Sequence, residues 1–157
     1  MRLTTVATQP FWRQVEAGGA VIPGQHIPVG LNVGSTLYTL HHNLDIFPEP
    51  YNYDIERWIP RDDSEEEKVR LRGMNRSYAP FSIGPRQCVA KNFAMMELLL
   101  TMANVFWRFD FESVGALGEG GEGLGMGREK KGEFQFKAFF TSHTEGPMIR
   151  FKRREGL

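Results

Sequence analysis

Cysteine is nearly absent from this chain, since Cys88 is the only one among 157 residues. A single thiol excludes a framework of internal disulfides, and it excludes a zinc site built on pairs of cysteines. Apolar runs long enough to cross a bilayer are also missing. We therefore expect neither a secretory leader nor a membrane anchor within these residues.

The chain lacks an excess of charge of either sign, because its 19 lysines and arginines balance its 19 aspartates and glutamates. Domains that bind nucleic acid usually carry a basic excess, so we expect no nucleic-acid partner. A hydrophobic share of 41% over 157 residues is typical of one ordinary domain with a packed core.

Glycine and proline divide the first part of the chain into short apolar runs. Residues 18–35 predict two strands and a turn, and a short helix is expected from about residue 36. The segment 44–60 is rich in proline and aromatic residues without periodicity, which is typical of an ordered loop pinned by buried rings. Residues 61–76 carry dense mixed charge and predict a solvated loop or a short exposed helix.

One long helix is predicted at residues 89–107, where the sequence is apolar on almost every side and lacks glycine and proline. Such a helix is expected to be buried on several sides. A flexible, glycine-rich loop follows at 115–132. The end of the chain alternates like a strand at 133–140 and returns at 146–154 as its partner. Because these elements are too few to cover the helix, we expect the chain to pack against more protein or a large apolar ligand.

Cys88 lies just before this helix, where free main-chain N–H groups carry partial positive charge and favour a thiolate. Gly84 and Pro85 suit a tight turn, and glycine lets a flat ligand approach the backbone closely. Arg86 offers paired donors for a carboxylate, and Phe81 is placed to shield the sulfur from water. The combination fits an axial thiolate ligand of haem. The alternative is an inert, buried cysteine.

The segment FSIGPRQCVA, residues 81–90, resembles the haem-binding signature of the cytochromes P-450. The signature positions are occupied by Phe81, Gly84, Arg86, Cys88 and Ala90, the last in place of the usual glycine. The resemblance implies that these residues bind haem, iron protoporphyrin IX, with the Cys88 thiolate as the metal ligand. Arg86 is then expected to contact a haem propionate, and no catalytic residue is assigned.

Arg57 and His41 match two further positions of the family, and the closing residues are most similar to fungal members. Arg2 fits the arginine of a glutamate–x–x–arginine motif whose glutamate would lie before Met1. The oxygen-activating helix of the family is also missing. We therefore expect a truncated, C-terminal portion of the family fold in which Arg2 and Arg57 are solvated.

The resemblance implies an α+β portion of the mainly helical cytochrome P-450 fold. Its expected parts are short N-terminal strands, a meander rich in proline and aromatic residues, the cysteine ligand loop, one long buried helix and a C-terminal β hairpin. We expect one partial domain over residues 1–157, with the strands at 1–43, the meander and charged loop at 44–80, the ligand loop and helix at 81–110, the glycine-rich loop at 115–132 and the last strands at 133–157.

The same resemblance implies further contacts. Arg13 is expected to approach the second haem propionate, and His41 either donates to a propionate or caps a turn. Val6, Ala7 and Thr8 are expected to line the substrate cavity above the haem, with ordinary strand packing as the alternative.

The implied activity is that of a haem-thiolate monooxygenase, which inserts one oxygen atom from O2 into a small apolar organic substrate. The family receives electrons from a partner reductase, and its full-length members are associated with the endoplasmic reticulum membrane. Turnover by this chain alone is not expected, because the groups on the oxygen side of the haem are missing. The alternatives are a non-catalytic remnant or interaction fragment, and a small β-rich domain with an inert thiol.

Overall fold

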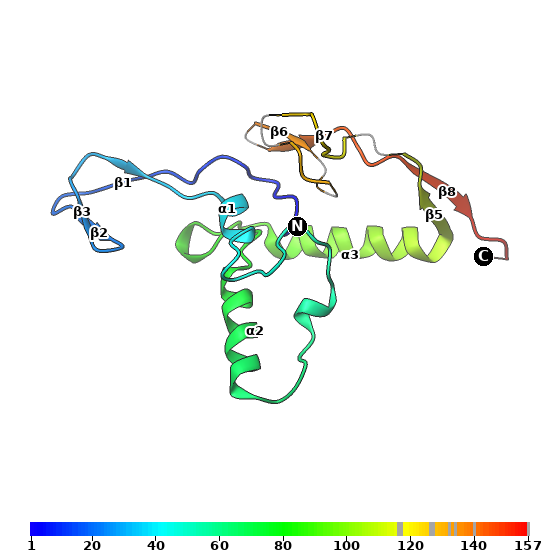
Figure 1. Ribbon diagram of the computed structural model, residues 1–157, viewed down its shortest axis with the longest axis horizontal. Helices are drawn as coiled ribbons and strands as arrows, with labels where there is room; N and C mark the ends of the chain where they lie inside the picture. The colour runs from blue at the N-terminus through cyan, green and yellow to red at the C-terminus, as the bar shows by residue number, and fades with distance from the viewer. Residues whose placement is uncertain (116–117, 126–127, 132, 134, 140, 157) are drawn as a thin grey trace. The chain divides into compact units, whose positions relative to one another are not determined.

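The computed structural model describes residues 1–115, 118–125, 128–131, 133, 135–139 and 141–156 (Figure 1). Within these residues the chain combines three α-helices with short strands, which pair into two-stranded sheets. This confirms the expected α+β class. The chain divides into two compact units, the first formed by 1–80 with 138–142 and the second by 81–137 with 143–157.

The first unit begins with two small antiparallel sheets. β2 (Ala20–Ile22) pairs with β3 (Gln25–Ile27), and β1 (Arg13–Gln14) pairs with β4 (Asn32–Val33). Between β2 and β3 the backbone turns through Gly24 at a φ of +78°, a conformation that glycine adopts without steric cost. The predicted pair of strands around a turn is confirmed.

The short helix α1 (Leu37–His41) starts where the sequence predicts a helix. The Thr36 hydroxyl caps it by accepting the Thr39 N–H at 3.1 Å. The loop that follows contains the short 3₁₀ helix η1 (Glu56–Trp58). Phe47 is completely buried in this unit, and its ring lies 6.1 Å from that of Trp58. The loop rich in proline and aromatic residues is therefore ordered around buried rings, as the sequence indicates.

The charged segment forms α2 (Glu65–Ser77), and Ser64 caps it through the Glu67 N–H at 3.2 Å. Three glutamates in its first turn favour the N-terminus of a helix electrostatically. The prediction of a solvated loop or short exposed helix is right about the helix but incomplete, because α2 buries Glu67 and Met74 within the first unit.

The second unit contains the 3₁₀ turn η2 (Gly84–Arg86) and the long helix α3 (Lys91–Arg108). β5 (Phe109–Ser113) follows α3 directly and pairs antiparallel with β8 (Ile149–Arg153), so that Phe111 lies opposite Phe151. β6 (Phe136–Ala138) pairs with β7 (Ser142–Thr144). The prediction that residues 133–140 pair with residues 146–154 is therefore wrong. The run at 146–154 returns to the end of α3, since β8 matches β5 over five residues.

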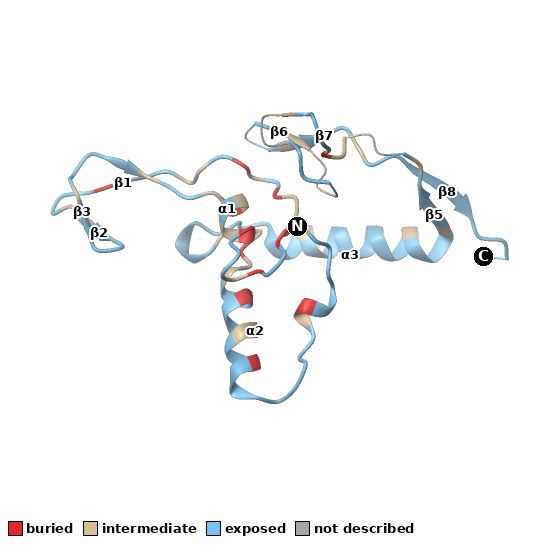
Figure 2. Ribbon diagram, viewed as in Figure 1, coloured by how far each residue is buried: buried red, intermediate tan, exposed pale blue. Residues whose placement is uncertain are grey.

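Helix α3 confirms the predicted helix but not its predicted burial. Figure 2 shows it exposed along almost its whole length. Within α3 only Ala94 and Val105 are half-buried. The side chains of Phe93, Leu99 and Trp107 are 64%, 64% and 65% exposed. Within the second unit, the described residues supply no surface that covers this helix. Among the described helices, none has the length and hydrophobicity of a membrane-spanning segment.

Candidate functional site

The loop that precedes α3 is closed by its own main chain. The Cys88 N–H donates to the Phe81 carbonyl at 2.8 Å, and the Gln87 N–H donates to the Gly84 carbonyl at 3.0 Å. Gly84 adopts a φ of +75°, which a residue with a Cβ reaches only with strain. These bonds give residues 81–88 a fixed turn with Cys88 at its end.

The Cys88 thiol is free and exposed. Arg86 and Ala90 are exposed beside it in sequence, while Phe81 is half-buried. α3 starts at Lys91, so Cys88 lies two residues before Ala90, the N-cap, rather than in the first turn. An accessible thiol on a fixed turn, with an unburied guanidinium two residues earlier, fits the donor set required by a flat metal cofactor that carries carboxylates. The alternative of an inert cysteine in the core does not match this exposure.

Arg13 and His41 lie in the first unit, whereas the cysteine loop belongs to the second. Arg13 is exposed on β1 and donates to the Trp12 carbonyl at 2.7 Å. The His41 ring is fully buried, and its Nε2 accepts the Ala79 N–H at 3.1 Å. Burial, with His42 and Arg2 nearby, lowers the pKa of His41 from 6.5 to about 4. The roles of Arg13 and His41 towards haem stay predictions.

The predicted substrate-cavity segment lies beside residues 138–142 of the same unit. The Ser142 N–H donates to the Val6 carbonyl at 2.7 Å, and the buried Thr8 hydroxyl donates to the Phe139 carbonyl at 3.2 Å. The Val6 side chain is 61% exposed, and Ala7 is half-buried. Two segments far apart in sequence are thus held together here by hydrogen bonds.

Arg2 and Arg57 are buried, with 7% and 5% of their surface exposed, so the expectation that both are solvated is wrong. Arg57 donates to the carbonyls of Pro48, Glu49, Asn52 and Asp54 at 2.9–3.3 Å. Main-chain carbonyls carry partial negative charge, so they stabilise this buried cation within the described residues.

Arg2 is held by the same loop. It donates to the Asn52 carbonyl at 3.1 Å and to the His41 carbonyl at 3.0 Å. It also lies over the Phe47 ring, with its guanidinium carbon 5.3 Å from the ring centre. Burial and the neighbouring Arg57 lower the pKa of Arg2. The Asn52 carbonyl therefore receives hydrogen bonds from two buried cations at once.

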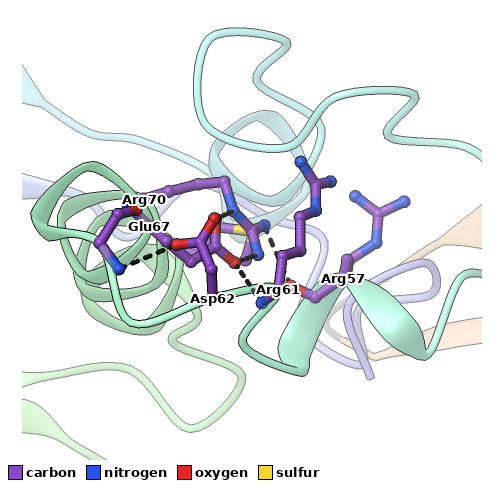
Figure 3. Close-up of polar contacts among 7 residues, drawn as sticks. Arg57, Arg61, Asp62, Glu67 and Arg70 are labelled. Carbon is purple, nitrogen blue, oxygen red and sulfur yellow. Dashed lines mark hydrogen bonds and ion pairs between the residues drawn. The ribbon is translucent and has the colours of Figure 1, made fainter.

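A second polar cluster, which the sequence patterns did not predict, is drawn in Figure 3. Glu67 is buried and forms a two-point ion pair with Arg70 on the same helix. A signal was present in the sequence, because Ser64 and Glu67 have the spacing of a capping box and Arg70 follows three residues later.

The turn at residues 81–88, with its exposed thiol, is compatible with the class of haem-thiolate proteins. A family profile described as Cytochrome P-450 matches residues 1–117. The chain belongs to the cytochrome P-450 family, and its curated relatives include many fungal monooxygenases. This confirms the resemblance inferred from the residues around Cys88.

Two fungal relatives illustrate the extent of the match. The cytochrome P-450 monooxygenase poxM of Penicillium oxalicum is 34% identical over 153 residues, which are 98% of this chain and 26% of poxM. The cytochrome P-450 monooxygenase apf7 of Gibberella fujikuroi is 39% identical over 160 residues, covering 99% of this chain and 29% of apf7. The chain thus spans between a quarter and a third of the length of these relatives.

Solved structures share the fold. A cyanobacterial cytochrome P-450 with bound retinoic acid superposes with a TM-score of 0.72 at 18% identity, over 98% of this chain and 30% of that one. The haem domain of cytochrome P-450DA gives a TM-score of 0.67 at 20% identity and covers 98% and 29%. This chain therefore has the fold of a portion of a cytochrome P-450.

Proposed function

We propose that this chain carries the thiolate-ligand portion of a haem-thiolate monooxygenase, in which the Cys88 sulfur would bind the haem iron. The observation that carries the proposal is the single thiol, exposed on a turn that the Cys88–Phe81 hydrogen bond closes at 2.8 Å. An exposed thiol in a fixed position is available to a metal, whereas one packed among aliphatic side chains is not.

The neighbouring residues have distinct roles in this proposal. Gly84 allows the left-handed turn, and its missing side chain leaves open space beside the backbone, since a Cβ there would meet no atom within 4 Å. Arg86 binds a propionate through its guanidinium, Phe81 keeps water from the sulfur, and the small Ala90 starts α3 without crowding the ring. Arg13 and His41 are proposed as further propionate contacts by family resemblance alone.

Haem bound at Cys88 would supply oxygen activation, which the side chains of this chain cannot perform by themselves. The protein's share is to hold the thiolate, orient the ring through Arg86 and exclude water with Phe81. Val6, Ala7 and Thr8, tied to residues 138–142, are proposed to border the cavity for a small apolar organic substrate. Electrons from a partner reductase and association with the endoplasmic reticulum membrane are proposed for the whole protein.

A non-catalytic remnant or interaction fragment is the second candidate, and one observation favours it. The apolar side chains of α3 are exposed along the helix (Figure 2), and such a surface is characteristic of a helix that requires further protein around it. A chain whose helix beside the ligand loop lacks cover would bind haem without excluding water, and oxygen insertion would then fail.

The test is the spectrum of the purified chain with added haem, reduced and then exposed to carbon monoxide. We expect a strongly red-shifted Soret band, which marks thiolate ligation, and we expect Cys88→Ser to abolish it. Gln87→Ser is the matched control, because it makes a similar polar change at an exposed neighbour and leaves the sulfur in place. Identical spectra for the unmodified chain and Cys88→Ser would exclude ligation of the iron by Cys88. The non-catalytic remnant would then be the remaining candidate.

A further inference from the structure

Helix α2 has no part in the haem proposal, yet it contains the buried carboxylate of Glu67. Its Oε2 accepts Arg70 Nε–H at 2.7 Å, and its Oε1 accepts a second bond from Arg70 Nη2. Oε1 also accepts the main-chain N–H of Arg61 at 3.2 Å (Figure 3). The carboxylate thus reaches out of its helix to the preceding loop.

Arg70 reaches the same loop at a different point. Its Nη1 donates to the main-chain carbonyl of Arg57 at 3.1 Å and approaches the sulfur of the buried Met74 at 3.7 Å. The ion pair therefore holds the carbonyl of Arg57 and the amide of Arg61. These two points are the ends of a five-residue segment, and both are main-chain groups.

The side chain of Arg57 then extends from this fixed backbone into the loop at 48–54. Its guanidinium binds four carbonyls there, including that of Asn52, which Arg2 also binds. Arginine presents its donors in a rigid planar fork, so a shift of its backbone misaligns several bonds together. The position of the Arg57 backbone accordingly sets how well the loop is held.

We propose that Glu67 and Arg70 are positioning residues that act through Arg57. By fixing the backbone of residues 57–61, they determine the shape of the loop at 48–54. This role goes beyond the proposed haem site, and it holds whether or not haem binds.

The electrostatics of the pair agree with this role. The hydrogen bond from Arg70 is the main cause that lowers the pKa of Glu67 from 4.5 to about 2, so the carboxylate is ionised near neutral pH. The same helix also carries an exposed pair, in which Lys68 lies 3.0 Å from Glu65. Exposed ion pairs of this kind contribute little to the stability of the fold. Substitution of Glu65 therefore provides a control that removes one negative charge from α2.

Hydrogen exchange of the full chain, read by mass spectrometry, tests the proposal. We expect Glu67→Gln to raise exchange at residues 48–54, read at the Asn52 amide that donates to the Glu49 carbonyl at 3.0 Å, roughly tenfold, because charge-assisted bonds that hold the Arg57 backbone are weakened. The matched control Glu65→Gln should leave exchange there unchanged. If Glu67→Gln alters the helix content seen by circular dichroism, Arg70→Lys replaces it, since lysine keeps the charge but lacks the fork.

The decisive comparison repeats the substitution in an Arg57→Lys background. If the pair acts through Arg57, Glu67→Gln adds no further exchange at 48–54 once the guanidinium is gone. An equal added effect in both backgrounds would overturn the proposal, because the pair would then hold the loop without Arg57. Faster exchange confined to α2, with 48–54 unchanged, would overturn it as well.

Discussion

At Arg2 and Arg57, main-chain carbonyls occupy the place that carboxylates usually take around a buried cation. In the part of the chain that the structure describes, neither guanidinium has a carboxylate within 4.0 Å. Arg57 instead binds four carbonyls of the loop at 48–54. Arg2 binds two carbonyls of that loop and the His41 carbonyl at the end of α1. Because a guanidinium carries five donors in a plane, it can satisfy many acceptors at once, and this makes burial of an unpaired arginine tolerable.

His41 should make the stability of the chain depend on pH. Its ring is buried without charge, and its pKa in the folded chain is about 4 against 6.5 ordinarily. As pH falls from 6.5 to 4, the unfolded chain takes up a proton that the folded chain refuses. The free energy of unfolding should therefore fall over this range, by about 3 kcal/mol from this group, and the loss should level off below pH 4.

The measurement is urea unfolding at several pH values for the unmodified chain and for His41→Gln. Glutamine retains an oxygen acceptor for the Ala79 N–H but does not titrate between pH 6.5 and 4. The difference between the two proteins should change across that range, while carboxylates elsewhere contribute equally to both. Parallel curves would mean that His41 binds its proton equally well in the folded and the unfolded chain, so that burial does not lower its pKa.

The two long helices contradict the expectation from their composition. α2 is rich in charge yet buries Met74 completely, whereas α3 is rich in apolar residues and buries none. The composition of a helix indicates which of its side chains can be buried. Their burial also requires another surface of the protein to pack against. α2 has such a surface in the loops of its own unit, whereas the described residues of the second unit offer none to α3.

This contrast predicts that substitution by alanine lowers the free energy of unfolding much more in α2 than in α3. Met74→Ala should lower the free energy of unfolding by about 2–5 kcal/mol, because it leaves a cavity. Leu99→Ala should change it by less than about 1 kcal/mol, since that side chain is already 64% exposed. Chemical denaturation of both variants measures the difference. A larger loss for Leu99→Ala would show that α3 is covered in solution.

At the scale of the whole molecule, the apolar surface of α3 is the property with the clearest consequence. Soluble monomers rarely expose large contiguous apolar patches. We expect the folded chain to bind the dye ANS and to increase its fluorescence. Replacing Phe93, Leu99 and Trp107 together by glutamine should reduce that signal at least about twofold, because these three side chains are each about two-thirds exposed.

The control for the dye experiment is an equal number of glutamine substitutions on α2, at Glu65, Lys68 and Arg72, whose side chains are exposed and polar. These should leave dye fluorescence unchanged. Dye binding that is insensitive to the α3 substitutions would place the apolar surface elsewhere in the molecule.

Local patterns were sufficient to predict several elements of this protein. Proline and glycine placed the β2–β3 turn, Thr36 marked the start of α1, and the absence of breakers predicted α3. The spacing of residues 81–90 indicated the family, because that signature is contiguous. These features depend on neighbours in the chain, which a sequence displays directly.

The tertiary structure alone decided which distant groups meet. Pairing of β8 with β5, burial of Met74 and Glu67 in a charged helix, and the carbonyls around Arg2 and Arg57 all depend on contacts between separate segments. A sequence states the donors and acceptors each segment offers, but loop closure and packing select their partners. Membership of the family was therefore predictable from ten contiguous residues. The burial and the hydrogen-bond partners of Arg2, Arg57 and Glu67 depended on the fold.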